Sequence, residues 1–130
     1  MLVNSLAVAA GGAIGSLARF WLAELCLRLG LTAFPWATLI ANVSGSLLIG
    51  TLAGAMTIEG RFPVSPAARL FWLVGICGGY TTFSSFSLQT LALAQEQAWL
   101  RAGANVIGSV ALCLAAVWLG YQLGARVGRP

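Results

Sequence analysis

The chain has 130 residues, of which 59% are hydrophobic and only 8% are charged, and its formal net charge is +4. Its mean hydropathy of +0.90 lies outside the range of a soluble domain and indicates an all-α integral membrane protein. Because one spanning helix needs about 20 apolar residues, four such helices would fill residues 1–130 as a single transmembrane domain.

The residue types that are present exclude most catalytic chemistry. The chain has no histidine, lysine or aspartate, and its only acids are Glu24, Glu59 and Glu96. Without histidine there is no histidine-activated nucleophile and no histidine-ligated zinc or haem, and without lysine there is no Walker phosphate loop. The positive charge is spread along the chain, unlike the clustered basic face of a nucleic-acid binder. We therefore expect neither an enzyme nor a nucleic-acid partner.

Two spans are predicted in the first half of the chain. The first covers about residues 2–29; no basic residues precede its long apolar run, so we expect a retained helix rather than a signal peptide. The second covers about residues 36–58, opens with the interfacial Trp36 and ends before a polar link that contains two prolines. These two stretches are long enough to cross a bilayer.

Two further spans follow, at about residues 67–97 and 99–124. The first of them is interrupted by Gly75, Gly78 and Gly79, which predict a break in the third helix because glycine makes unwinding cheap. Unwound backbone inside a membrane is tolerated only where it is buried in protein or lines a cavity. The break therefore indicates either a functional cavity or a glycine kink that accommodates a neighbouring helix.

Four spans place both termini on one side, so the arginines on each face can be counted to predict orientation. The terminal face would carry Arg61, Arg69, Arg126 and Arg129. The opposite face would carry Arg28 and Arg101, with Arg19 beside them. This bias is weak enough to allow insertion in both orientations.

Small and sulfur-containing residues in the spans have structural interpretations. Three cysteines, an odd number, all in apolar runs, do not suit a disulfide framework, and we expect Cys26, Cys77 and Cys113 to be buried small hydrophobic residues. Small-residue spacings predict packing seams between helices; they are Gly11–Gly15, Ser46–Gly50–Gly54 and Gly120–Gly124–Gly128.

Polar side chains recur at helical spacing in three of the four spans. In the second span they are Thr38, Asn42, Gly45 and Ser46. In the fourth they are Arg101, Asn105, Ser109 and Cys113. In the third, one face carries Phe83, Phe86, Ser87 and Thr90, and the face beside it carries Thr82, Ser85 and Gln89.

These stripes have two interpretations. Single hydroxyls and amides commonly join helices in membranes, each contributing roughly 1 kcal/mol. Donors at many levels of three helices instead favour a hydrated track, and neutral donors with arginines at the ends suit a small anion. The positive ring edges of two phenylalanines can replace part of the water around an anion, and carbonyls released at a helix break can face a hard cation such as Na⁺.

The glycine-rich stretch also resembles a known motif. Residues 75–87, GICGGYTTFSSFS, resemble the G-x-x-G-G-x-T-T-F-S-T-F signature of the Fluc/CrcB fluoride channels. The resemblance extends to residues 12–20 (GAIGSLARF) and 38–45 (TLIANVSG), and to the order and length of the spans over essentially the whole chain. Two positions depart from the pattern, because Ser85 stands where threonine is usual and Phe20 stands where tyrosine is usual.

The resemblance implies an antiparallel, dual-topology homodimer in the bacterial inner membrane, with two pores that export fluoride passively from the cytoplasm. It implies a structural Na⁺ on the dimer axis, held by backbone carbonyls of Gly78 and Thr81. It makes Phe83 and Phe86 the pore-facing pair, Asn42 a donor and Arg19 the vestibule cation. The other polar positions expected along the pore are Thr38, Ser85, Ser87, Thr90, Asn105 and Ser109, the last two aligned by spacing only.

Two other functions remain open from the residues alone. A small dual-topology, proton-coupled exporter would match the length and topology, but it needs an acid in the middle of a span, and Glu24 lies near the end of its helix. A non-transporting membrane assembly subunit would use the polar stripes only for packing. Transport of fluoride is the function that the sequence favours.

Overall fold

The computed structural model describes residues 1–56 and 64–128, and every described element is helical. In chain order the elements are α1 (Leu2–Arg28), α2 (Trp36–Ala55), α3 (Pro66–Arg69), η1 (Leu70–Cys77), α4 (Gly78–Tyr80), α5 (Phe83–Gln95) and α6 (Trp99–Gly128). The predicted end of the second span at residue 58, and Arg61 and Arg129 of the charge count, lie outside the described residues.

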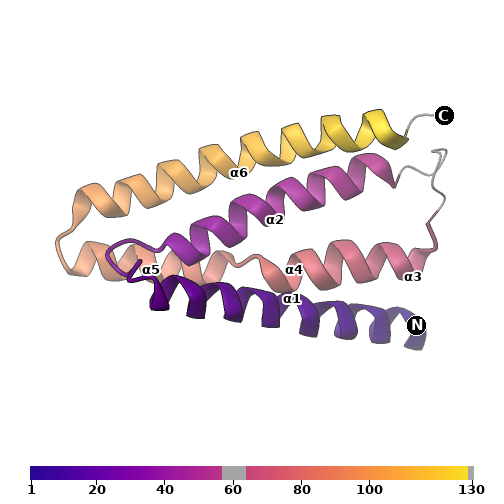
Figure 1. Ribbon diagram of the computed structural model, residues 1–130, viewed down its shortest axis with the longest axis horizontal. Coiled ribbons are helices and arrows are strands. Elements are labelled where there is room, and N and C mark those ends of the chain that lie inside the picture. Colours follow the sequence, from indigo (N-terminus) through magenta and orange to yellow (C-terminus); the bar gives the residue numbers. More distant parts are fainter. Residues whose placement is uncertain (57–63, 129–130) are drawn as a thin grey trace.

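The helices run roughly along one direction, and both termini lie at the same end of the molecule (Figure 1). The segments α3, η1, α4 and α5 lie end to end and together extend over most of the molecule's length (Figure 1). The helix α2 packs mainly against α6, whereas α1 packs mainly against η1 and α4. The chain therefore forms two helix pairs, joined by smaller contacts of α2 with η1 and α1 and of α5 with α6.

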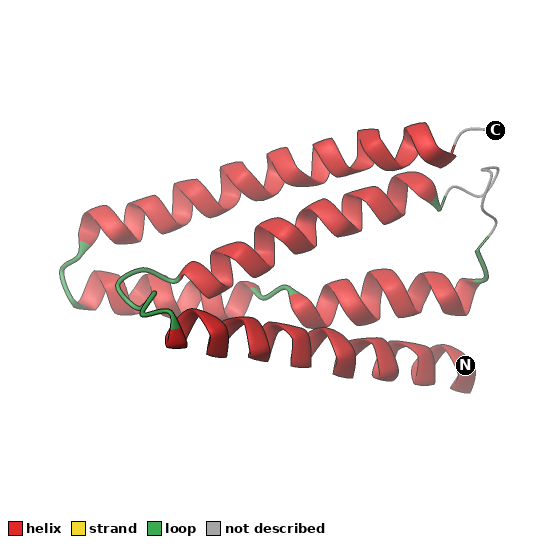
Figure 2. Ribbon diagram, viewed as in Figure 1, coloured by secondary structure: helices red, strands yellow, loops and turns green. Residues whose placement is uncertain are grey.

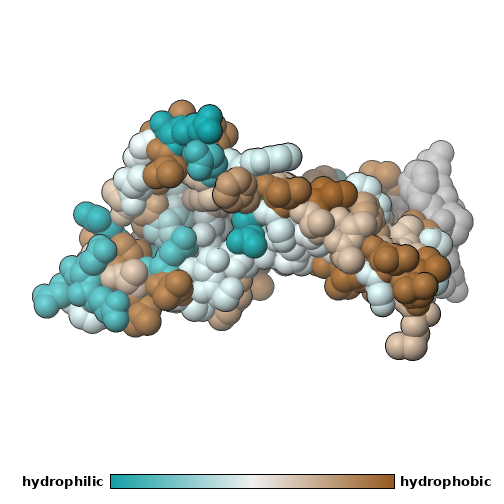
Figure 3. Space-filling model, turned by 90° about the horizontal axis from the view of Figure 1, so that it is seen from below, coloured by the Kyte–Doolittle hydropathy of each residue, from teal (hydrophilic) through white to brown (hydrophobic). Residues whose placement is uncertain are grey.

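Within the described parts of the chain, three helices are long and apolar enough to cross a membrane: Leu2–Arg28, Trp36–Ala55 and Trp99–Val127. Large hydrophobic side chains on their outer faces are exposed, such as Trp21 at 64% and Trp118 at 65%, as expected of surfaces that contact lipid. On the face seen in Figure 3, hydrophilic residues gather mainly at the end where α1 finishes and α6 begins. These features define a multi-pass membrane protein.

Glycines bring the backbones of paired helices into direct contact. A Cβ at Gly50 or Gly54 would overlap backbone of α6, and one at Gly120 or Gly124 would overlap backbone of α2. The predicted packing seams are confirmed at Gly50–Gly54 and Gly120–Gly124, and also at Gly11–Gly15, where a Cβ would overlap backbone of η1. Without the glycines, α2 and α6 would have to move apart and lose their close van der Waals contact.

The prediction that the third helix unwinds at its glycines is wrong about the position. Gly75 lies in a π-helical turn, and Gly78 is helical, with φ −66° and ψ −35°. Extended backbone occurs instead at Thr81 (φ −83°, ψ 158°) and Thr82 (φ −155°, ψ 119°), the green stretch between α4 and α5 in Figure 2. Gly75 and Gly79 serve another purpose, because a Cβ at either would meet the α1 backbone within about 3 Å.

Candidate functional site

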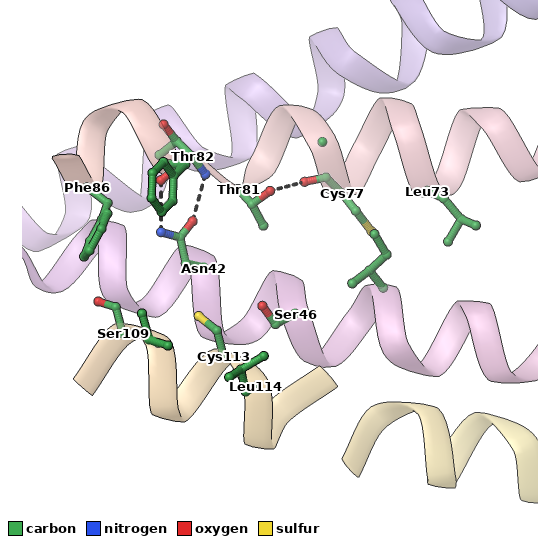
Figure 4. Close-up of a pocket in the computed structure, with 14 residues that line it drawn as sticks. Asn42, Ser46, Leu73, Cys77, Thr81, Thr82, Phe86, Ser109, Cys113 and Leu114 are labelled. Atoms are coloured by element: carbon green, nitrogen blue, oxygen red, sulfur yellow. Dashed lines mark hydrogen bonds between the residues drawn. The ribbon is translucent and has the colours of Figure 1, made fainter. Parts of the chain in front are cut away.

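A cavity of about 410 Å³ lies beside the extended residues, between α2, η1, the start of α4, the start of α5 and the middle of α6 (Figure 4). Six of the predicted site residues line it: Asn42, Gly78, Thr81, Phe83, Phe86 and Ser109. Ser46, Thr82, Cys77 and Cys113 add polar or sulfur atoms, and Ile49, Leu73, Val110 and Leu114 complete the wall. Among the residues that the structure describes, no carboxylate or arginine lines the cavity, so the polar groups found there are neutral.

Asn42 reaches from α2 to the extended backbone. The Thr82 N–H donates to Asn42 Oδ1 at 2.7 Å, and Asn42 Nδ2 donates to the Thr82 carbonyl at 3.0 Å (Figure 4). The amide group has a second N–H, for which no partner occurs among the described residues. Asn42 can therefore hold Thr82 and still offer one donor to the cavity.

Two carbonyls at the break lose their helical donors. In a continuous helix the Thr82 N–H would donate to the Gly78 carbonyl and the Ser85 N–H to the Thr81 carbonyl. Here the Thr82 N–H donates to Asn42 instead, and the Ser85 N–H donates to Thr82 Oγ1 at 3.1 Å. The carbonyls of Gly78 and Thr81 are therefore available as neutral oxygen ligands, whereas Arg19 Nε donates to the Gly79 carbonyl at 3.3 Å.

The start of α5 brings a partial positive charge to the cavity. The first N–H groups of a helix have no intrahelical acceptors, and their dipoles align along the helix axis. In α5 the Ser85 N–H is capped by Thr82, and the residue that opens the helix is Phe83. The site thus combines donors at the start of α5 with carbonyl acceptors at the end of α4.

Phe83 and Phe86 form an aromatic pair beside the cavity. Their ring centroids are 5.2 Å apart and the ring planes are inclined by 43°. Phe86 is 8% exposed, whereas Phe83 is 76% exposed in the single chain. Both rings line the cavity, and one of them also presents a large apolar surface to whatever lies outside the subunit.

Three of the other predicted polar residues, in α5 and α6, form a hydrogen-bonded cluster, and the rest of them lie outside the cavity lining. Ser109 Oγ donates to Asn105 Oδ1 at 3.3 Å, Asn105 Nδ2 donates to Thr90 Oγ1 at 2.8 Å, and Thr90 Oγ1 donates to the Phe86 carbonyl at 2.7 Å. Asn105 is completely buried, and of this cluster only Ser109 lines the cavity. Thr38, Ser85, Ser87 and Arg19 also lie outside the lining.

Some cavity residues were not among the predicted site residues. Thr82 was placed on a helix face, although its backbone is extended and bonded to Asn42. The expectation of three buried cysteines holds for Cys26 and Cys77 but is wrong for Cys113, which is partly exposed and lines the cavity together with Cys77. Ser46 and Cys113 already belong to the polar stripes that helical spacing predicts, one turn beyond Asn42 and Ser109, but they are not among the predicted pore positions.

A second cavity, of about 480 Å³, lies at the end of the molecule where α1 finishes and α6 begins. Gln89, Glu96 and Arg101 are among its lining residues. Arg101 donates to the Ala33 carbonyl at 3.3 Å, and Gln89 Oε1 is buried with no hydrogen-bond partner among the described residues. Polar groups thus occur at two levels along α5 and α6.

Helices that are apolar on the outside, with a largely apolar cavity that carries a few neutral polar groups beside a break at mid-length, define a multi-pass membrane protein with a candidate site in its middle. The model of the family described as "CrcB-like protein, Camphor Resistance (CrcB)" matches residues 6–121, and the chain belongs to this family.

Curated relatives are similar over nearly the whole chain. The chain is 55% identical over 122 residues to the fluoride-specific ion channel FluC of Paramagnetospirillum magneticum, covering 94% of this chain and 95% of that protein. It is 54% identical over 114 residues to the protein of the same name from Rhodospirillum rubrum, covering 88% of each chain. The protein of that name from Methylocella silvestris is 48% identical over 119 residues, covering 92% of this chain and 91% of that protein.

Proposed function

We propose that this protein is a fluoride-selective channel that lets F⁻ leave the cytoplasm passively and so relieves fluoride toxicity. The observation that carries the proposal is its 55% identity, over 94% of the chain, to a protein named fluoride-specific ion channel. The cavity supports the same function, because the unpaired Asn42 N–H and the aromatic rings of Phe83 and Phe86 lie where a small anion could be stabilised. The protein moves its substrate without chemical conversion.

The cavity residues have distinct roles in this mechanism. Fluoride holds its water strongly, so a pore must replace that water with closely spaced donors while remaining too narrow for larger anions. The unpaired N–H of Asn42 belongs to a residue that lines the cavity and supplies such a donor, whereas the Ser109 O–H is donated to Asn105 Oδ1. Ring edges of Phe83 and Phe86 carry partial positive charge and stabilise the anion without trapping it.

We propose that two chains assemble as an antiparallel homodimer in the bacterial inner membrane. Phe83 lines the cavity but is 76% exposed in the single chain, so one subunit leaves the cavity wall incomplete. A second, inverted subunit would cover this ring and form the other side of each pore. Dual topology is compatible with the weak charge bias of the sequence.

The backbone around the break fits a structural Na⁺. Hard cations prefer oxygen ligands, and the carbonyls of Gly78 and Thr81 lose their helical donors to Asn42 and to the Thr82 hydroxyl. Gly78 has no heavy atom within 4 Å of the position that a Cβ would occupy, so its backbone is accessible from that side. When bound, the ion would neutralise carbonyl dipoles from both subunits and fix the two breaks against each other.

The first test is ion release from proteoliposomes loaded with fluoride or chloride, measured with ion-selective electrodes and without a pH gradient. We expect fast release of fluoride and retention of chloride. Fluoride release that requires a pH gradient would instead indicate a proton-coupled exporter. Release of neither ion from folded, dimeric protein would indicate a membrane subunit that does not transport.

A further inference from the structure

The side-chain amide of Asn42 forms a pair of hydrogen bonds with the backbone between α4 and α5. Among the described residues its two hydrogen bonds are both to the backbone of one residue: the Thr82 N–H donates to Asn42 Oδ1 at 2.7 Å, and Asn42 Nδ2 donates to the Thr82 carbonyl at 3.0 Å (Figure 4). A side-chain amide carries the same donor and acceptor as a peptide bond, and two residues in a hydrogen-bonded pair of antiparallel strands exchange the same two bonds. The backbone of Thr82 is extended, like that of a residue in a β-strand.

The bond to Asn42 competes directly with a helical bond. A partly buried N–H needs an acceptor, and the acceptor that a continuous helix offers to Thr82 is the Gly78 carbonyl. Asn42 Oδ1 takes that N–H, so α4 ends at Tyr80 and α5 begins at Phe83. A hydrogen bond between Ser44 Oγ and Tyr80 Oη, at 3.0 Å, also ties the end of α4 to α2, two residues after Asn42.

We propose that Asn42 is a positioning residue that fixes the break: by holding the Thr82 backbone it ends α4, releases the Gly78 carbonyl and sets the start of α5. Through that start it places Phe83, the next residue, and Phe86, one turn later, at the cavity. Its second N–H has no partner among the described residues. The effect on ion flux rests on the fluoride-channel function proposed above, whereas the effect on the backbone does not.

The alternative is that Asn42 only contacts the ion and that its bonds to Thr82 hold nothing. The two roles differ in what happens to the Thr82 amide when the side chain is changed. If Asn42 positions the break, removing the acceptor must expose that amide to exchange with solvent. If Asn42 only contacts the ion, the flux changes and the Thr82 amide does not.

The test is hydrogen exchange of the full chain in nanodiscs, labelled with ¹⁵N-threonine and followed by NMR. The variants are Asn42→Ala, which removes the acceptor, and Asn42→Asp, which keeps a carboxylate oxygen to accept from the Thr82 N–H. Ser46→Ala is the matched control, because Ser46 lies one turn further along α2 and lines the same cavity. Amides of Thr51 and Thr90, in the helices α2 and α5, are internal references for intact folding.

We expect exchange at Thr82 to accelerate by at least about tenfold in Asn42→Ala and to slow again in Asn42→Asp, because one lost hydrogen bond changes an opening equilibrium by about this factor. Ser46→Ala should leave the Thr82 rate within about twofold of the parent. A Thr82 rate in Asn42→Ala equal to that of the parent would overturn the proposal. So would a rate in Asn42→Asp equal to that in Asn42→Ala.

Fluoride efflux measured on the same samples distinguishes the channel function from the positioning role of Asn42. We expect both Asn42 variants to lose most of their flux, the alanine variant through the displaced break and the aspartate variant through the lost donor and its negative charge. If the parent protein carries no fluoride but the exchange pattern appears, the channel function fails and the positioning role stands. If the parent carries fluoride but the Thr82 rate does not respond, the positioning role alone fails.

Discussion

Phe83 offers the sharpest test at the scale of one residue, because it lines the cavity while contributing little to the fold of a single chain. Phe83→Ile removes the ring edge but keeps an apolar side chain, so we predict a folded dimer with fluoride flux reduced at least about tenfold. The matched control is Phe20→Ile on α1, where the ring is 60% exposed and lies outside the cavity lining. Loss of the dimer, rather than of flux, in Phe83→Ile would contradict the pore assignment.

Asn105 shows that the same residue type can have a different role. It is completely buried and links Ser109 to Thr90, so its amide joins α6 to α5. We predict that Asn105→Ala destabilises the protein by about 1–3 kcal/mol, since Thr90 and Ser109 lose a buried partner. Thermal unfolding in detergent of Asn105→Ala, Thr90→Ala and the double variant should give a coupling energy of about 1 kcal/mol. Additive effects would show that this hydrogen bond does not join the helices.

At the scale of elements, the seam between α2 and α6 depends on the absence of side chains. A Cβ at Gly124 would overlap the Thr51 carbonyl and approach the Ala55 nitrogen at 2.9 Å, so the helices must separate. We predict that Gly124→Ala destabilises by about 1–3 kcal/mol, as overpacking does. Gly103→Ala on the same helix meets no atom within 4 Å and should be neutral or stabilising by up to about 1 kcal/mol. Equal unfolding temperatures for the two variants would refute this account.

The sequence predicts the helices better than it predicts the break. Hydropathy, Trp36 and the prolines place the helical stretches because they act within one segment. The position of the break depends on Asn42, forty residues from Thr82, and on the contacts of Gly75 and Gly79 with α1. Neither contact appears in local spacing, so the glycines alone pointed to the wrong residues.

The same limit applies to the candidate site. Helical spacing shows which residues share a face but not what that face meets. Asn42 and Asn105 both belong to polar stripes, yet one lines the cavity and the other is enclosed between α5 and α6. The motif from Gly75 to Ser87 identifies the region, and the fold decides which of its polar groups face the cavity.

At the scale of the whole molecule, an antiparallel dimer makes a prediction that no single chain can satisfy. Among the described residues, Arg69 and Arg126 lie toward the terminal end, and Arg28 and Arg101 lie toward the other. Because this balance allows both orientations, added positive charge should fix one of them. One variant carries Leu31→Lys, Thr32→Lys and Ala33→Lys, which should keep the end where α1 finishes and α6 begins in the cytoplasm. The other carries Gln122→Lys and Val127→Lys, which should keep the opposite end there.

Either charge variant, expressed alone, then lacks the inverted partner that completes the pores. We predict that each loses at least about tenfold of its fluoride efflux from cells, and that co-expression of the two restores efflux to within about twofold of the parent. Labelling of single cysteines introduced at each end, from outside the cell, verifies the orientation of every variant. Full efflux from a variant shown to be in one orientation would exclude the antiparallel dimer, because parallel subunits or a single chain would then suffice for transport.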